Sequence, residues 1–199
     1  MIDLATKRYW VFDMDGTLTV AVHDFDAIRD ALGLRQGRPI LEQLAELPDG
    51  EAARLRERLD VIEKGLVEKA SAQKGAPELL ALLAGQGAKM GILTRNSHEN
   101  AILTLEVCGL SQYFDGGDVL GRESCKVKPS ADGIHKLLDG WGADPGDAVM
   151  VGDYLFDLVA GREAGTATVY LDTNGGFDYR DHADVCVHDL GELARLITE

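Results

Sequence analysis

Short apolar runs alternate with stretches of helical spacing over most of this chain. Mainly apolar runs without a polar break suit strands that are buried on both faces of a sheet. The predicted strands are residues 9–12, 89–93, 118–120, 148–151, 168–171 and 184–187. Leucine and isoleucine at helical spacing fill most of the segments between them. Because strands and helices alternate, we predict an α/β fold with a three-layer, Rossmann-like, mostly parallel sheet.

One segment interrupts this alternation. Between residues 20 and 74 the apolar positions follow helical spacing, and no convincing strand is visible. The predicted helices of this segment are residues 25–32, 40–47 and 55–70. We therefore predict a core domain of residues 1–19 and 75–199, with an inserted helical cap domain of residues 20–74. A helical element beside a ligand site can exclude water and select substrates.

Polar side chains follow three of the predicted strands at the point where each strand ends. Asp13 and Asp15 follow the first strand, Thr94 follows the second, and Asp153 follows the strand at residues 148–151. The carboxyl ends of parallel strands share one edge, and ligands bind at that edge of an open α/β sheet. Two carboxylates this close repel each other unless one is protonated or a cation lies between them. The pair therefore indicates either a shared proton or a divalent metal.

Charge narrows the range of partners. Acidic residues outnumber basic ones by 34 to 20, which gives the 199-residue chain a formal net charge of -14. Such a surface repels nucleic acids and anionic membranes, so we expect neither as a partner. An anionic substrate would need local positive charge, either from a metal or from a few well-placed Lys and Arg side chains.

Composition also bears on compartment and cofactors. The chain is 45% apolar, yet no apolar run reaches the length of a membrane span. Residues 1–8 lack the apolar core of a signal peptide, so a cytoplasmic location is the expectation. The three cysteines and five histidines are dispersed, which argues against a disulfide framework and against a zinc site.

Four short motifs then resemble those of a known family, the haloacid dehalogenase-like (HAD) superfamily. They occur in that family's order and span nearly the whole chain. The matching residues are Asp13-x-Asp15-Gly16-Thr17-Leu18, Thr94 after an apolar strand, Lys128-Pro129, and Gly152-Asp153-x-x-x-Asp157. The helical insert after the first motif resembles the small cap of the subgroup that includes phosphoglycolate phosphatases and β-phosphoglucomutase.

This resemblance implies a phosphoryl-transfer mechanism. Asp13 would attack phosphorus and form an aspartyl-phosphate, while Asp15 would act as general acid and then as general base. A Mg²⁺ ion would be held by Asp13, by the backbone carbonyl of Asp15 and by Asp153, because magnesium favours hard oxygen ligands. Thr94 would hydrogen-bond the phosphoryl group, and Lys128 would neutralise its charge.

Several positions leave alternatives open. Asp157 is either a further metal ligand or a neighbour that positions one. Lys126 competes with Lys128 for the phosphate, and the Lys-Pro pair favours Lys128. Arg95 directly follows Thr94 and either contacts substrate or is a surface charge. Arg35 and Arg38 lie in the predicted cap, where they are candidates for a second anionic group of the substrate.

The predicted function is a Mg²⁺-dependent phosphatase acting on a small phosphorylated metabolite, as a monomer or homodimer. Asp15 favours phosphoryl transfer over carbon–halogen cleavage, because the dehalogenating members of the family lack an Asp there. Two alternatives remain. A phosphomutase of the β-phosphoglucomutase type would need a further acid/base group in the cap, for which His23 is a candidate. A receiver-like signalling domain also carries a phosphorylated Asp, but it is shorter and lacks a cap insert.

Overall fold

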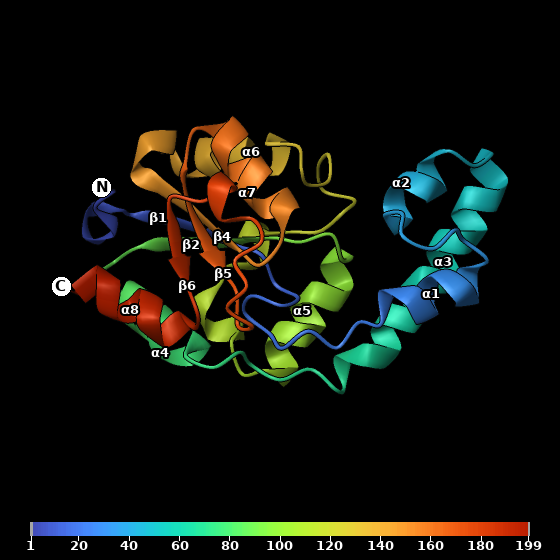
Figure 1. Ribbon diagram of the computed structural model, residues 1–199, viewed down its shortest axis with the longest axis horizontal. Coiled ribbons are helices and arrows are strands. Elements are labelled where there is room, and N and C mark those ends of the chain that lie inside the picture. The colour runs from blue at the N-terminus through green and yellow to red at the C-terminus, as the bar shows by residue number, and fades with distance from the viewer. Residues whose placement is uncertain (1, 199) are drawn as a thin grey trace.

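The central feature of the fold is a six-stranded sheet in which every strand is parallel to its neighbours. The computed structural model describes residues 2–198 and is drawn in Figure 1. The strands are β1 (Tyr9–Phe12), β2 (Lys89–Leu93), β3 (Val119–Leu120), β4 (Ala148–Gly152), β5 (Ala167–Leu171) and β6 (Val185–Val187). Their order across the sheet is β3-β2-β1-β4-β5-β6. The predicted α/β fold class is confirmed.

Helices cover both faces of this sheet. On one face lie α4 (Ala76–Gly85), α5 (His98–Val107) and α8 (Leu190–Thr198), and on the other lie α6 (Asp132–Trp141) and α7 (Leu155–Ala164). Figure 1 shows α4 and α8 on the opposite side of the strands from α6 and α7. Short 3₁₀ helices occur at Leu4–Thr6, Ser111–Tyr113, Gly116–Asp118, Pro145–Asp147 and Arg180–His182.

The alternating geometry of β1 explains why its sequence has no polar break. Trp10 and Phe12 pack into the apolar cluster under α4, α5 and α8, whereas Val11 packs into the cluster under α6 and α7. Successive side chains of a strand point to opposite faces of the sheet. A central strand covered on both sides therefore needs apolar residues at every position.

Three helices lie apart from the sheet, at the right of Figure 1. They are α1 (Phe25–Leu32), α2 (Ile40–Ala45) and α3 (Asp49–Val67), and they share an apolar cluster of their own. We call this group the cap. The predicted helices are present, but α3 ends three residues earlier than the apolar pattern suggested. The domain boundaries at residues 19 and 75 stay a prediction.

The segment before α6 forms a turn. Pro129 and Ser130 precede the helix, which begins at Asp132. The Ser130 hydroxyl accepts the backbone N–H of Asp132 at 3.3 Å, and Ser130 itself closes a turn onto the Val127 carbonyl. The turn leaves Lys128 outside the helix, where its side chain reaches the edge of the sheet.

Strand order determines where a ligand can bind. From β1 the chain proceeds through β2 and β3 on one side, and then returns to build β4, β5 and β6 on the other. The direction of winding reverses between β1 and β4. In open α/β sheets the crevice at the carboxyl ends of two such strands is the usual ligand site. Asp13 follows β1 there, and Asp153 follows β4.

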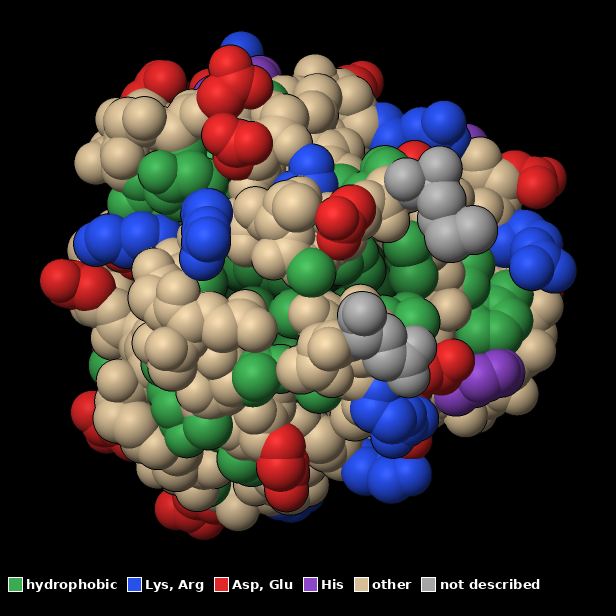
Figure 2. Space-filling model, turned by 90° about the vertical axis from the view of Figure 1, so that its left-hand side faces the viewer, with side chains coloured by type: hydrophobic (Ala, Val, Ile, Leu, Met, Phe, Trp, Pro, Cys, Tyr) green, Lys and Arg blue, Asp and Glu red, His purple; other side chains and the backbone are tan. Residues whose placement is uncertain are grey.

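The face of the molecule farthest from the cap has a mixed composition. Figure 2 shows the face farthest from α1, α2 and α3, where acidic and basic side chains are intermingled with small hydrophobic patches. Across residues 2–198, no helix combines the length and the apolar character that a bilayer crossing requires.

Candidate active site

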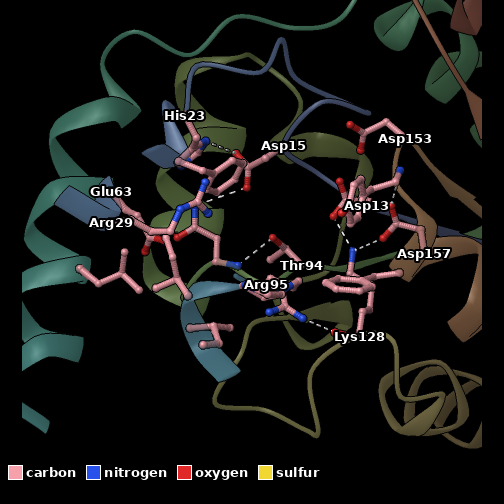
Figure 3. A pocket seen from close by; sticks show the side chains of 18 of the residues that line it. Asp13, Asp15, His23, Arg29, Glu63, Thr94, Arg95, Lys128, Asp153 and Asp157 are labelled. Carbon is pink, nitrogen blue, oxygen red and sulfur yellow. Dashed lines mark hydrogen bonds and ion pairs between the residues drawn. The ribbon is translucent and has the colours of Figure 1, made fainter. Parts of the chain in front are cut away.

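A cavity of about 420 Å³ opens between the carboxyl edge of the sheet and the cap. All seven site residues predicted from the sequence line it: Asp13, Asp15, Thr94, Arg95, Lys128, Asp153 and Asp157. They come from the loops that follow β1, β2, β3 and β4, except Asp157, which lies in the first turn of α7 after β4. Figure 3 shows Asp13, Lys128, Asp153 and Asp157 on one side of the cavity and His23, Arg29 and Glu63 on the other.

Three carboxylates and one ammonium group form the deepest part of this site. Asp13, Asp153 and Asp157 each offer an oxygen within 4.8 Å of the other two. Lys128 is 1% exposed, and its Nζ lies 2.5 Å from Asp13 Oδ1 and 2.7 Å from Asp157 Oδ1. When all are ionised, the group carries two negative charges in excess. A divalent cation with a preference for oxygen ligands would balance that charge.

Burial and neighbouring charges shift the pKa values of these groups. Burial raises the pKa of Asp13, and the charge of Asp15 raises it further, against the opposing effect of Lys128. Burial likewise raises the pKa of Asp153 well above its usual range and that of Asp157 to about 6. Burial alone would lower the pKa of Lys128, but Asp13 and Asp157 together raise it. Perturbed values of this kind cluster at functional sites.

Two glycines of the sequence motifs allow the carboxylates to approach. Gly16 has φ +99°, and a Cβ atom there would lie 2.3 Å from Asp153 Oδ2. The next residue, Thr17, donates its hydroxyl to Asp153 Oδ1 at 3.2 Å. A Cβ atom on Gly152 would lie 2.4 Å from the carboxyl carbon of Asp157. These contacts give a steric reason for glycine at both positions.

Asp157 has a structural task as well as its ion pair. It lies in the first turn of α7, where its Oδ2 accepts the backbone N–H of Tyr154 at 3.0 Å. With Oδ1 on Lys128, both of its oxygens already have partners. This arrangement suits a residue that positions Lys128, although its oxygens also lie within reach of a shared cation.

The Asp15 side chain points away from the other carboxylates and towards the cap. Its Oδ2 accepts a 3.4 Å hydrogen bond from the Asn96 amide, and its Oδ1 lies 3.7 Å from His23 Nδ1. It is not part of the three-carboxylate cluster. The prediction had assigned only its backbone carbonyl to the metal, so the side chain is free for a separate task.

Thr94 and Arg95 differ in their surroundings. Thr94 is 2% exposed, and its hydroxyl oxygen accepts the N–H of Asn96 at 3.0 Å. Arg95 lines the cavity, but its guanidinium is held by both carboxylate oxygens of Glu42 in α2, at 2.6 and 2.9 Å. It also lies 4.8 Å from the ring centroid of Phe156. Arg95 therefore joins core to cap, and its contact with substrate stays a prediction.

The other candidate cations are placed less centrally. Lys126 is exposed and does not line the cavity, whereas Lys128 does; the contact of Lys128 with a phosphate stays a prediction. Arg35 does not line the cavity either. Arg38 does, but both of its terminal nitrogens contact Glu46, the closer at 2.5 Å.

Several lining residues escaped the sequence analysis, among them Phe25, Arg29, Glu63, Asn96 and Phe156. A signal existed for Glu63, because it lies four residues after Leu59 and thus on the apolar face of α3. It is 7% exposed, and Arg122 donates to its Oε2 at 2.8 Å. A charged residue on a buried helix face is rarely accidental.

Comparisons with known proteins agree with these motifs. A family model described as haloacid dehalogenase-like hydrolase matches residues 24–171. An uncharacterized hydrolase of Saccharomyces cerevisiae is 30% identical over 94% of this chain and 89% of its own length. A phosphoglycolate phosphatase of Aquifex aeolicus is 30% identical, covering 81% and 83% of the two chains, and a putative pyrophosphatase of Clostridium perfringens is 24% identical, covering 79% and 80%.

A solved structure extends the agreement to the whole fold. A hydrolase from Pseudomonas syringae superposes with a TM-score of 0.80 at 23% identity, covering 96% of this chain and 98% of that one. The family model matches well over half of the sequence, and the relatives align over most of their lengths. The chain belongs to the haloacid dehalogenase-like hydrolase family.

Proposed function

We propose that this protein is a Mg²⁺-dependent phosphatase that hydrolyses a small phosphomonoester through an aspartyl-phosphate on Asp13. The observation that carries the proposal is the position of Asp13. Its carboxylate lies at the winding reversal of the sheet, 2.5 Å from a buried ammonium group and beside two further carboxylates. A nucleophile at this point faces a cavity of the size that small-molecule ligands occupy.

The first half-reaction transfers the phosphoryl group to the protein. An Asp13 oxygen forms a bond to phosphorus as the ester P–O bond breaks. Asp15 gives its proton to the departing oxygen, which leaves as an alcohol. Because Asp15 points towards the cap while Asp13 faces the core, the leaving group would lie on the cap side.

The second half-reaction releases phosphate. Asp15, now ionised, takes a proton from a water molecule as that water attacks phosphorus. The bond between phosphorus and Asp13 breaks, and Asp13 regains its carboxylate. Lys128 stays charged throughout, since its two carboxylate partners raise its pKa, and its positive charge would stabilise the transferring group.

The donor set fits magnesium. Asp13 and Asp153 would hold the ion, with the Asp15 carbonyl as predicted from the motif. Burial is the main cause of the raised pKa of both carboxylates, and a bound cation would favour their charged forms. When bound, Mg²⁺ would supply charge neutralisation at the phosphoryl oxygens. Catalysis otherwise depends on positioning by residues of this chain.

Phosphate release by an Asp13→Asn variant tests the proposal. The amide keeps the shape of the side chain but removes the nucleophile, so turnover of phosphomonoesters in Mg²⁺ should fall by at least a factor of about 10³. Asp139→Asn, an exposed position on α6, is the matched control and should retain full activity. Retained turnover in the Asp13 variant, with a native circular dichroism spectrum, would refute the assignment of the nucleophile.

A phosphomutase is the second candidate, and the position of His23 beside Asp15 is the observation in its favour. A mutase returns the phosphoryl group to the substrate, which requires exclusion of water and a second acid/base group. Isomerisation of a sugar phosphate without net phosphate release would favour the mutase over the phosphatase. Because the chain belongs to a hydrolase family, we do not retain the receiver-domain alternative.

A further inference from the structure

The cap side of the cavity has a different character from its catalytic side. Five of its lining residues have large apolar side chains: Phe25, Ile40, Leu41 and Leu59 from the cap, and Phe156 from α7. We call these residues the apolar wall. Phe25 lies at the first position of α1 and is 53% exposed, although it is one of the largest apolar side chains of the cap. A ligand in the cavity would cover it.

The arginines near this wall already have partners. Arg29 donates from Nε to Gln36 Oε1 at 2.9 Å, and its remaining nitrogens contact the Asp26 carboxylate and the Arg38 carbonyl. Its side chain is 13% exposed, which leaves it little freedom to move.

The other two arginines are paired with glutamates of α2 and its C-terminal end. Arg95 is held by Glu42, and Arg38 by Glu46. Among the described residues, no arginine that lines the cavity is therefore without an anionic partner. A second anionic group on the substrate would have to displace one of these carboxylates.

Carboxylates, in contrast, face the cavity near this wall. Asp15 points towards the cap, and Glu63 of α3 is buried beside it with Arg122 as its partner. Asp15 serves as the proton donor and Glu63 is paired with Arg122, so neither offers positive charge to a carboxylate or second phosphate on the leaving group. An anionic leaving group would thus lose water without gaining a cation, which disfavours it.

The position of His23 locates the leaving group on the apolar wall. Its side chain is 7% exposed, and its Nδ1 has no hydrogen-bond partner among residues 2–198. The ring stacks on Phe25 with centroids 5.6 Å apart. Asp15 lies 3.7 Å from this ring and would protonate the leaving oxygen. The atoms that follow that oxygen must then lie against the His23–Phe25 pair.

We propose that the substrate is the phosphomonoester of an uncharged, ring-bearing alcohol whose ring packs against Phe25 and His23. This inference rests on the proposed phosphatase function and narrows its substrate class. A carboxylate-bearing or diphosphate substrate would instead require a free cation on the cap side of the cavity.

Three primary-alcohol phosphates test the proposal with the full-length protein in Mg²⁺. Benzyl phosphate carries the ring, ethyl phosphate lacks it, and 2-phosphoglycolate carries a carboxylate instead. The expected kcat/KM for benzyl phosphate exceeds that of each of the other two by about tenfold or more, because a ring filling an apolar pocket gives discrimination of this order.

The Phe25→Ala variant tests whether the substrate ring packs against Phe25. The variant should reduce the preference for benzyl over ethyl phosphate by about tenfold, since both substrates place the same atoms at the catalytic side. Val61→Ala, an exposed position of α3 outside this cavity, is the matched control and should leave the preference unchanged. Phe25 is half exposed, so its replacement removes little of the cap core.

A binding measurement separates recognition from chemistry. With the Asp13→Asn protein, calorimetry should give a lower Kd for benzyl phosphate than for 2-phosphoglycolate. A higher kcat/KM for 2-phosphoglycolate or pyrophosphate, lowered by Arg38→Met, would overturn this inference and leave the phosphatase proposal standing. A benzyl preference unaffected by Phe25→Ala would overturn the placement of the ring. No phosphate release from any ester would overturn the phosphatase proposal itself, and this inference with it.

Discussion

At the scale of single residues, Lys128 is the group on which the charge balance of the site depends. It is buried, and it contacts two carboxylates, that of Asp13 at the end of β1 and that of Asp157 in the first turn of α7. A buried ion pair is expensive to break from one side, because the remaining charge stays buried without a partner. Lys126, two positions away, is exposed and has no such contacts.

Lys128→Met is therefore expected to destabilise the metal-free protein by about 3–5 kcal/mol, because Asp13 and Asp157 lose their common partner. Urea unfolding followed by tryptophan fluorescence measures this change. Lys126→Met is the matched control, with an expected change below about 0.5 kcal/mol. Equal free energies of unfolding for the two variants would contradict the stabilising role of the buried ion pairs of Lys128.

The raised carboxyl pKa values lead to a pH dependence. Burial raises the pKa of Asp157 to about 6 and also raises those of Asp13 and Asp153. Between the unfolded-state value of about 4 and the folded value of about 6, the folded protein binds more protons than the unfolded chain. The contribution of Asp157 to stability is thus present at low pH and lost as the pH rises through this window.

Magnesium should reverse this trend, because an ion binds only the deprotonated carboxylates. We expect the increase in Tm caused by saturating Mg²⁺ to be larger at about pH 7 than at about pH 5. Differential scanning calorimetry measures both, with sodium chloride of equal ionic strength as the control. An identical increase at the two pH values would argue against these carboxylates as the ligands.

At the scale of secondary-structure elements, α3 connects the cap to the core through several ion pairs, in addition to the Arg95–Glu42 pair of α2. Arg122, in the loop after β3, contacts Asp60 and Glu63 of α3 and donates to the Arg95 carbonyl at 3.2 Å. Its side chain is 10% exposed. A second pair, Lys64 with Glu99 of α5, joins the same two parts of the molecule but is largely exposed to solvent.

Arg122→Met is expected to destabilise the protein by about 2–4 kcal/mol, since Glu63 would remain buried without a cation. Lys64→Met is the matched control and should change stability by less than about 1 kcal/mol, as exposed pairs contribute little. Urea unfolding gives both values. Hydrogen exchange should also become faster in α3 in the first variant, and unchanged protection there would contradict this role of Arg122.

At the scale of the whole molecule, the apolar residues form three separate clusters. Two lie on the faces of the sheet, and the third, under α1, α2 and α3, contains six buried residues among those that the structure describes. A small cluster buries little apolar surface and stabilises its helices correspondingly little. Figure 1 shows the same division, with the cap set apart from both termini.

The cap is therefore expected to unfold at lower denaturant concentration than the core. Both tryptophans, Trp10 and Trp141, lie in the core, so their fluorescence reports the core alone. Far-ultraviolet circular dichroism reports helices of both parts and should begin to change first. Leu44→Ala, which removes a fully buried side chain of α2, should widen the separation. Coincident transitions in both proteins would show that cap and core unfold together.

Much of the catalytic side of the site could be predicted from the sequence, for a physical reason. Asp13, Thr94 and Asp153 each follow an apolar run, and parallel strands end at a common edge. The apolar pattern that identifies a strand is local, so it can be recognised from the sequence without the tertiary structure. Lys128 does not directly follow a predicted strand. It could be identified only because Lys128-Pro129 resembles a motif of the family.

The sequence by itself thus determined the α/β alternation, the helical insert and the carboxylates at the strand ends, because each depends on a local pattern of neighbouring residues. The tertiary structure alone decided which cations are already paired. Glu42 lies 53 positions from Arg95, and Glu63 lies 59 positions from Arg122. Contacts between the cap and the core depend on how distant segments pack, and no local pattern records that packing.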